Sequence, residues 1–198
     1  MKSFSPLLGV LLTAIALMSA GCSAPEDQQA LAAITEYGGR FKTDDQGRVI
    51  DVDLSRTKAN DAVVALLRAL PFVKSLNLGH TPVTGATLDQ LSTMHDLETL
   101  TIANSELNDD GLAHVAPLTS LRALHVGSTK ITDAGLPAVR GLTKLRAFTA
   151  SDTEISDAGL FNFRNLKDLT TLLLNRTKVT QKGVQELQRF LPDANIDR

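Results

Sequence analysis

The sequence predicts an α/β solenoid, a fold in which similar units stack side by side and share one parallel sheet. Three observations support this prediction. A pattern of apolar residues recurs every 24 residues, each copy begins with a short segment of alternating apolar residues, and each copy continues with the spacing of a turn and a short helix. A unit this small cannot bury its apolar face alone, so stacking of neighbours must supply the core.

The repeat is clearest over residues 121–144, which read LRALHVGSTKITDAGLPAVRGLTK. In this copy Leu124 and Val126 point to one side of the predicted strand, while Ala123 and His125 point to the other. We therefore expect the first pair in the core and the second pair on the exposed face of the sheet. Six copies cover residues 49–192 and begin at Val49, Val73, Leu97, Leu121, Leu145 and Leu169.

The LxxLxLxx segments resemble the leucine-rich repeat. A hydroxyl residue occupies the ninth position, where that repeat usually has Asn or Cys: Thr57, Thr81, Ser105, Thr129, Thr153 and Thr177. The chain is thus similar to bacterial leucine-rich-repeat proteins with Thr at this position. The resemblance implies a parallel sheet on the concave side, short helices on the convex side, and a partner, usually a protein, bound by the concave sheet. We expect each hydroxyl to donate to one backbone group and to accept from another in the next repeat.

The second half of each copy predicts a turn and a short helix. Pro137 lacks an amide hydrogen and is tolerated in a first helical turn, which limits its helix to roughly two turns. A glycine recurs where backbones approach closely or φ is positive, at Gly111, Gly135, Gly159 and Gly183. An aspartate recurs two residues before three of these glycines, at Asp109, Asp133 and Asp157. We interpret these carboxylates as first-turn acids of the helices rather than as calcium ligands, because Gly85 and Gln181 interrupt the column.

Residues 1–21 are predicted to be a secretory signal. Lys2 is followed by an apolar run that is too short for an ordinary membrane-spanning helix. The run ends in Ser-Ala-Gly-Cys, which resembles the lipobox of bacterial lipoproteins and implies lipidation of Cys22. Ser19 stands where a lipobox usually has Leu, and ordinary cleavage near a free thiol is the alternative. Ser23 favours sorting to the outer membrane, so the expected location is the periplasmic face of that membrane.

The segment between the signal and the repeats is interpreted as a tether and a cap. Residues 22–29 are expected to comprise the lipidated cysteine and a polar tether. Residues 30–48 predict an N-terminal cap, made of a short amphipathic helix, a strand near Phe41 and a hairpin turn over residues 43–47. Tyr37 is interpreted as part of this cap rather than as a ligand contact.

Residues 193–198 are interpreted as a C-terminal cap. Ile196 lies one period after Leu172, which is a predicted strand residue. We therefore expect a short seventh strand to close the repeat array.

The composition excludes several classes of function. Cys22 is the only cysteine, so the chain forms no internal disulfide and no thiolate metal site. The formal net charge is −2, and it becomes −3 when residues 1–21 are removed, because Lys2 is their only charged residue. A slightly acidic body argues against nucleic acid as a partner. No cofactor is indicated, and we expect a monomer.

No set of residues points to catalysis or to a metal centre. The histidines fall at unrelated positions of the repeat, at His80, His95, His114 and His125. They therefore do not predict a metal site. Asp53, Ser75 and His80 lie on neighbouring predicted strands, but they lack the strained nucleophile turn and the oxyanion donors of a hydrolase. We therefore predict that the protein is not an enzyme.

The candidate partner-binding residues are Arg122, His125 and Arg146. The two arginines are one period apart, so they are expected to project from strands about 4.8 Å apart, and His125 shares their face. Guanidinium groups suit carboxylate or phosphate acceptors and are frequent at protein interfaces. The alternative interpretation is a solvated basic spot that is partly neutralised by Glu98, one repeat earlier.

Two classes of function are consistent with these observations. The first is a non-enzymatic protein-binding module that is anchored to a membrane as a lipoprotein of the bacterial envelope. The second is an envelope protein that binds polysaccharide or acts as a spacer, and a hydrolase ranks third. The exposed strand positions of the six copies contain no aromatic residue, whereas sugar-binding surfaces usually stack rings on aromatics. Protein binding is therefore the favoured prediction.

Overall fold

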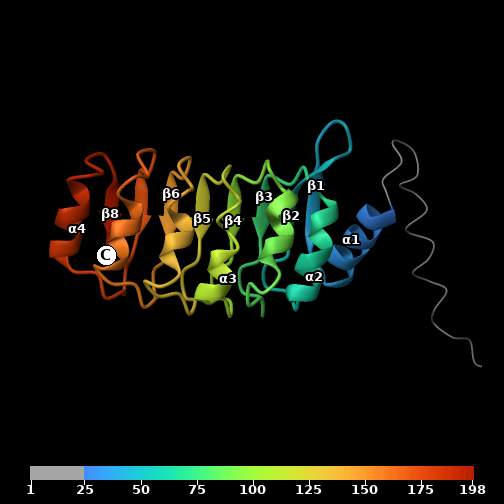
Figure 1. Cartoon of the computed structure of the whole chain (residues 1–198). Coiled ribbons are helices and arrows are strands. Elements are labelled where there is room, and N and C mark those ends of the chain that lie inside the picture. Colours follow the sequence, from blue (N-terminus) through green and yellow to red (C-terminus); the bar gives the residue numbers. More distant parts are fainter. Residues whose placement is uncertain (1–24) are drawn as a thin grey trace, which may run out of the picture.

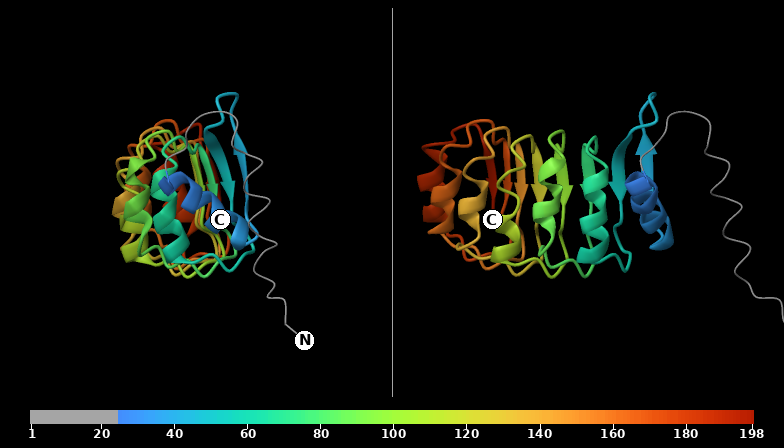
Figure 2. Two further views of the ribbon diagram at one scale, coloured as in Figure 1. Left: turned by 90° about the vertical axis from the view of Figure 1, so that its right-hand side faces the viewer. Right: turned by 45° about the vertical axis from the view of Figure 1, so that its right-hand side comes forward.

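The computed structural model describes residues 25–198. Within them, eight strands form one sheet in chain order, and the helices that connect the strands lie along one face of it (Figures 1 and 2). The units stack side by side along the length of the molecule, as the repeat predicts (Figure 1). The predicted signal segment and Cys22 lie outside the described residues. No helix within residues 25–198 is long and apolar enough to cross a membrane.

The sheet is parallel except at its first strand. The strands are β1 (Arg40–Thr43), β2 (Val49–Asp53), β3 (Ser75–Asn77), β4 (Thr99–Thr101), β5 (Ala123–His125), β6 (Ala147–Thr149), β7 (Thr171–Leu173) and β8 (Asn195–Asp197). β1 pairs with β2 in the antiparallel direction, and every later pair is parallel. The register advances by one period per strand: Leu100 pairs with Leu124, and Leu124 pairs with Phe148. This confirms the period and the phase of the predicted strands.

The helices between the strands are short, and many are 3-10 helices. The α-helices are α1 (Pro25–Glu36), α2 (Asp61–Leu66), α3 (Asp109–Ala113) and α4 (Gln181–Gln188); the 3-10 helices are η3 (Leu67–Ala69), η4 (Leu88–Thr93), η5 (Leu136–Val139) and η6 (Gly159–Phe163). Pro137 lies in the first turn of η5, as predicted. That helix has only 4 residues, which is within the predicted limit of roughly two turns. We call the face covered by these helices the helical face, and the opposite face of the sheet the open face.

The N-terminal cap has the predicted helix, strand and turn, but its helix begins earlier than predicted. α1 starts at Pro25 rather than at Ala30, so residues 25–29 are helical and the prediction of a tether over residues 22–29 is wrong for them. Proline is suited to a first helical turn, and Glu26 and Asp27 lie at the positive end of the helix dipole. Ala30 and Ile34 of this helix are fully buried against the first repeat.

The hairpin of the cap follows the predicted pattern. Phe41 on β1 pairs with Val52 on β2. In the turn between them, the Asp44 carboxylate accepts hydrogen bonds from the amides of Gln46 (2.9 Å) and Arg48 (3.0 Å). The antiparallel strand thereby occupies the edge of the sheet that the first repeat would otherwise leave open.

At the C-terminal end, β8 is the predicted short strand, and Ile196 pairs with Leu172. One position at this end departs from the repeat. Phe190 lies one period after the buried Leu166, but Phe190 is 40% exposed and Leu191 is buried instead. The preceding helix α4 has 8 residues, whereas α3, which begins at the same position of the third repeat, has 5 and is followed by the buried Leu118. The longer α4 ends closer to Phe190, and Leu191 takes the core position after it.

The core contains the leucines that define the repeat, and in the fifth copy it contains two phenylalanines. Phe148 and Phe163 are fully buried, with ring centroids 5.0 Å apart and an interplanar angle of 58°. Ala150, at a position where the fourth copy has Val126, is also fully buried. The larger rings and the smaller Ala150 thus share the closely packed core of this copy.

The hydroxyl column closes the turn within each repeat rather than linking repeats. Thr129 donates to the carbonyl of Val126 at 2.6 Å, and the other members make the same bond three residues back. In several repeats the hydroxyl also accepts from an amide two residues ahead, as Thr57 does from Ala59 (3.1 Å). The expectation of an acceptor role toward the next repeat is therefore wrong, because the turn brings the nearest free amide from the same repeat.

Aspartates link one repeat to the next. The Asp109 carboxylate accepts from the amide and the hydroxyl of Thr132, and Asp133 and Asp157 bind Ser156 and Thr180 in the same way. These bonds, rather than a first-turn role alone, explain the column. The recurring glycines do not have positive φ. Gly135, Gly159 and Gly183 leave room for these aspartates, since a Cβ on Gly135 would lie 2.6 Å from Oδ1 of Asp109. At Gly111 a Cβ would lie 2.6 Å from the carbonyl oxygen of Thr84, so this glycine marks the expected close approach of two backbones.

Candidate functional site

The open face of the sheet is lined by half-buried, mostly small side chains. The third and fifth residues of each repeat point to this face, and in β5 and β6 they are Ala123, His125, Ala147 and Thr149. Ala123, Ala147 and Thr149 have short side chains. The longer side chains at the strand starts therefore extend beyond them from the sheet. This is the face on which the sequence places the candidate residues.

The structure brings Arg122 and Arg146 into one row at the starts of β5 and β6. The amide of Arg122 donates to the carbonyl of Glu98 (2.7 Å), and the amide of Arg146 donates to the carbonyl of Arg122 (2.8 Å), so the three residues stack in register. We call Glu98, Arg122 and Arg146 the arginine row.

The two arginines of the row differ in their pairing. Nε of Arg122 lies 3.1 Å from Oε2 of Glu98, with both side chains about half exposed. Arg146 forms no salt bridge with any residue of the range 25–198. Because exposed ion pairs contribute little to folding stability, Arg146 and the outer donors of Arg122 are available to an acceptor at small cost.

His125 lies on the same face but is bonded to the next strand. Its Nδ1 is 3.1 Å from Oγ1 of Thr149 on β6. Burial lowers the pKa of His125, which favours the neutral imidazole. His125 therefore adds a polar, neutral group beside the arginine row rather than a third positive charge.

Two further charged rows border the sheet, and the sequence reasoning did not identify them. Lys130 pairs with Glu106, and Lys178 pairs with Glu154, each across neighbouring repeats. At the turn after the strand, Arg176 binds Asp152, and this ion pair lowers the pKa of Asp152. The sequence does carry a signal for the first row, because Glu and Lys alternate at the tenth residue of the last four repeats. These ion pairs join adjacent repeats. Their charged groups are already paired, so they are less available to a partner than Arg146 is.

The residues of the conceivable hydrolase triad are not joined. Asp53 accepts a hydrogen bond from the amide of Ser55 (2.9 Å) and lies 3.9 Å from Nη2 of Arg40. Burial raises the pKa of Asp53, but the bonds from Ser55 and the charges of Arg40 and Lys42 outweigh it and hold the pKa below the usual value. No hydrogen bond connects Asp53, Ser75 and His80 among the described residues, and His80 sits in a turn with a φ of 58°. This arrangement stabilises a carboxylate but supplies no activated nucleophile.

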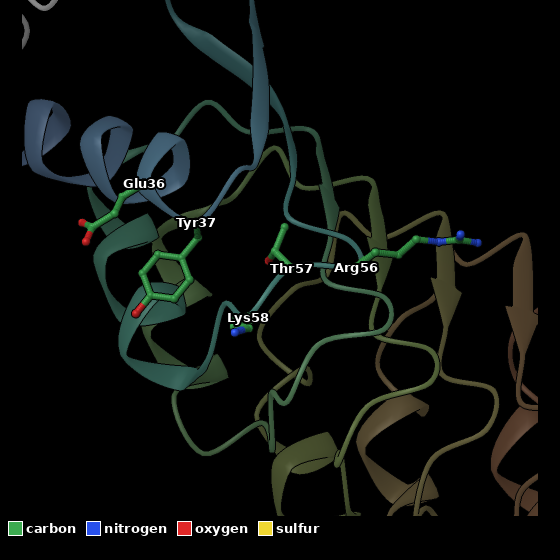
Figure 3. Close-up of a pocket in the computed structure, with 5 residues that line it drawn as sticks. All are labelled: Glu36, Tyr37, Arg56, Thr57 and Lys58. Carbon is green, nitrogen blue, oxygen red and sulfur yellow. The ribbon is translucent and has the colours of Figure 1, made fainter. Parts of the chain in front are cut away.

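A shallow depression of about 460 Å³ lies where the end of α1 meets the turn after β2 (Figure 3). Glu36 and Tyr37 come from the cap, and Arg56, Thr57 and Lys58 come from the turn. The side chain of Arg56 extends away from Tyr37, so the charged groups do not converge on one point (Figure 3). Tyr37 packs against the core as a partly buried ring, as expected of a cap residue.

Metal ligands are not grouped in the described part of the chain. Within residues 25–198, no three His, Cys, Asp or Glu side chains come together in a way that could hold a metal ion. Cys22, the predicted lipidation site, lies outside the described residues.

The helical face carries exposed aromatic rings that the sequence reasoning missed. Phe161 is 56% exposed and Phe190 is 40% exposed. The guanidinium of Arg164 lies over both rings, and that of Arg140 lies over Phe161. The signal in the sequence is Phe161 itself, which occupies a position that other repeats fill with Ala, Asp, Pro or Gln.

Comparisons with known proteins agree with this geometry. A protein family described as Leucine Rich repeat matches residues 118–139. No curated protein matches the sequence. Among solved structures, an internalin (inlF) from Listeria monocytogenes is similar with a TM-score of 0.54 and 21% identity. The match covers 75% of this chain and 47% of that one, so the chain spans about half the length of that internalin.

An internalin C2 from Listeria monocytogenes is similar with a TM-score of 0.50 and 16% identity, and the match covers 82% of this chain and 89% of that one. At these identities the likeness concerns the fold. Together with the parallel sheet, the 24-residue register and the short helices on one face, it shows that the described residues form a leucine-rich-repeat solenoid.

Proposed function

We propose that this protein is a non-enzymatic protein-binding module that uses the open face of its sheet around Arg122, His125 and Arg146. The observation that carries the proposal is the arginine row, in which Arg146 has no ion-pair partner within residues 25–198 while small side chains surround it. A guanidinium so placed offers several donors to a carboxylate of a partner. A sheet of eight strands is roughly 35 Å wide, which suits one partner of ordinary size.

We also propose that the module is exported and held as a lipoprotein, through Cys22, on the periplasmic face of a bacterial membrane, with the outer membrane favoured. The signal-like first 21 residues, the Ser-Ala-Gly-Cys sequence and Ser23 support this part of the proposal. Mass spectrometry of the mature N-terminus tests it. An acylated peptide beginning at Cys22 is expected, and an unmodified peptide that begins elsewhere would contradict the anchor without affecting the binding proposal.

The binding proposal is tested by crosslinking the tagged protein in intact envelopes and identifying what is captured. Recurrent capture of one protein is expected, and recovery of glycan fragments instead would favour the polysaccharide-binding alternative. The captured protein is then purified and its affinity measured for the double variant Arg122→Ala with Arg146→Ala. A loss of roughly tenfold or more is expected, because each arginine is proposed to make a charge-assisted hydrogen bond.

A matched control removes two positive charges elsewhere. Arg176→Ala with Lys178→Ala has the same change in charge, but both residues are already paired, with Asp152 and Glu154. Equal weakening by both double variants would indicate a general electrostatic effect and remove the arginine row from the proposal. Added salt should weaken binding of the native chain more than that of the Arg122 and Arg146 variant.

A further inference from the structure

The helical face of the last three repeats carries an alternating row of cations and rings: Arg140, Phe161, Arg164 and Phe190, which we call the Arg–Phe ladder. The guanidinium of Arg140 lies 5.6 Å from the ring centroid of Phe161, and that of Arg164 lies 4.8 Å from Phe161 and 4.5 Å from Phe190. All three distances fall within the range of cation–π interactions. The ladder belongs to η6 and to the loops that follow the helices, whereas the arginine row lies at the starts of β5 and β6.

Folding does not explain why these rings are exposed. Phe161 occupies the seventeenth residue of its repeat, which other copies fill with the smaller side chains Ala65, Asp89, Ala113, Pro137 and Gln185. In the sixth repeat Leu191 occupies the core position, and Phe190 remains at the surface. Neither ring fills the core, so both are free to contact another molecule.

The ladder is held in place before any partner arrives. Nε of Arg140 donates to Oδ1 of Asn162 at 2.6 Å, and Asn162 is 6% exposed and donates to the carbonyl of Gly159 at 2.8 Å. A buried amide thereby fixes the direction of an exposed guanidinium. Arg140 keeps its terminal nitrogens for other acceptors, because Nε makes the only side-chain hydrogen bond of Arg140 within the described residues.

The second half of the ladder is tied together by a lysine. Nζ of Lys167 donates to the carbonyl of Phe190 (2.8 Å) and to the carbonyl of Arg164 (2.9 Å), which joins two neighbouring repeats. Arg164 forms no salt bridge with any residue between 25 and 198. Groups that are ordered in advance lose less entropy on binding, so this surface can bind with fewer contacts.

The charge around the ladder indicates the kind of partner. The loops at residues 140–144, 164–168 and 189–193 hold Arg140, Lys144, Arg164, Lys167 and Arg189 against only Asp168 and Asp193. The whole chain has 20 Lys and Arg against 22 Asp and Glu, so this is a local positive excess. A partner with carboxylates complements it, and an apolar side chain between those carboxylates complements the rings.

We propose that the Arg–Phe ladder is a second protein-binding surface, which takes an extended acidic segment with carboxylates two or three residues apart and apolar side chains between them. The two guanidiniums flank the ring of Phe161 at 5.6 and 4.8 Å, so they lie at most about 10 Å apart. Carboxylates two to three residues apart in an extended chain span about 7 to 10 Å. An anionic membrane is a poorer fit, because Asp168 and Asp193 are exposed on the same loops and only two rings are available for insertion.

The probe is a short fluorescein-labelled peptide with aspartate at every second position and leucine or glycine between, and binding to the full chain is measured by fluorescence anisotropy. Binding is expected, and the same peptide with asparagine for aspartate should not bind. Arg164→Gln should weaken binding at least about tenfold, the effect of losing one charge-assisted hydrogen bond. Phe161→Ala should also weaken it, and both variants should unfold at the same urea concentration as the native chain.

Two matched controls make the result specific to the ladder. Phe72→Ala removes another exposed ring that lies under an arginine, with Arg48 at 4.7 Å, and it should leave the affinity unchanged. Arg68→Gln removes one exposed positive charge on η3 of the first repeat, away from both proposed binding surfaces, and should change the affinity little. Equal weakening by Arg68→Gln and Arg164→Gln would overturn the proposal, because attraction by net charge would then explain the binding.

A measurement of binding to lipid vesicles, together with the crosslinking described above, separates the remaining outcomes. If the peptide fails to bind while phosphatidylglycerol vesicles sediment the chain and Arg164→Gln abolishes this, the ladder is a lipid-binding surface and the proposal is wrong. If neither probe binds, the proposal is also wrong. Either failure leaves the proposal for the open face intact, because that one depends on Arg122 and Arg146.

Discussion

The carboxylate of Asp109 binds both the amide and the hydroxyl of Thr132, a residue of the following repeat, at 2.8 and 2.6 Å. Asp61, Asp133 and Asp157 make the same two bonds one repeat ahead. The stability of a solenoid is the sum of its repeats and of the contacts between neighbours. These aspartates are therefore direct contributors to the second term.

Replacing Asp109 should weaken the interface between the third and fourth repeats. Asp109→Ala leaves the half-buried amide and hydroxyl of Thr132 without this acceptor, and we expect a loss of about 1.5–3 kcal/mol in the free energy of unfolding. Urea denaturation measures the loss. Asp110→Ala is the matched control, because Asp110 is exposed and its side chain makes no hydrogen bond within residues 25–198, so a change below about 0.5 kcal/mol is expected. Equal effects of the two variants would show that the contacts of Asp109 with Thr132 add no stability.

Gly135→Ala tests whether Gly135, Gly159 and Gly183 leave room for the aspartates of the preceding repeat. A Cβ at this position would lie 2.6 Å from Oδ1 and 3.1 Å from Cα of Asp109, so the carboxylate would have to move from its bonds with Thr132. We expect a loss of about 1–3 kcal/mol, as for other overpacked sites. Gly141→Ala provides the comparison, since a Cβ there meets nothing within 4 Å and should leave thermal stability unchanged or slightly higher. A stable Gly135 variant would contradict this explanation of the column.

Phe148→Ala should be one of the most damaging single substitutions in the chain. The ring is fully buried and packs on Phe163 at 5.0 Å, so its removal leaves a cavity in the core of the fifth repeat. A loss of about 3–5 kcal/mol is expected in chemical denaturation. Phe161→Ala removes a ring of the same size that is 56% exposed, and it should cost far less. A loss below about 1 kcal/mol at Phe148 would be inconsistent with the observed packing.

His125 should make stability depend on pH. Burial lowers its folded-state pKa below the ordinary value of 6.5, so the unfolded state binds more protons in the window between the two values. Its stabilising effect is complete above pH 6.5 and is lost as the pH falls through the lower folded-state pKa. Melting temperatures of the native chain and of His125→Gln, measured between pH 7.5 and 5, should show a smaller decrease in the variant. Parallel curves for the two proteins would rule out His125 as the titrating group.

The sequence by itself determined the architecture, because the same local pattern recurs in each of the six copies. The phase that places Leu124 and Val126 inside and His125 outside is a property of alternation along one strand, and the structure confirms it. The position of Ile196 likewise predicted β8, since one period separates it from Leu172. Each of these predictions needs only residues that are close in sequence or one period apart.

The tertiary structure decided which polar groups meet and where the helices end. Nothing in the local pattern indicates that Asp109 reaches forward to Thr132, or that Thr129 bonds its own repeat at Val126. Those choices depend on how the turns of two units face each other.

The tertiary structure also determined the type and length of each helix, and therefore which aromatic rings are buried and which are exposed. In the sixth repeat α4 extends to Gln188, Leu191 takes the core position, and the ring of Phe190 remains at the surface beside Arg164. Helices this short are not stable in isolation, so packing against the neighbouring repeat decides which helix forms and where it ends. The periodicity therefore fixed the sheet and its register, while the contacts between repeats fixed the aspartate bonds and the Arg–Phe ladder.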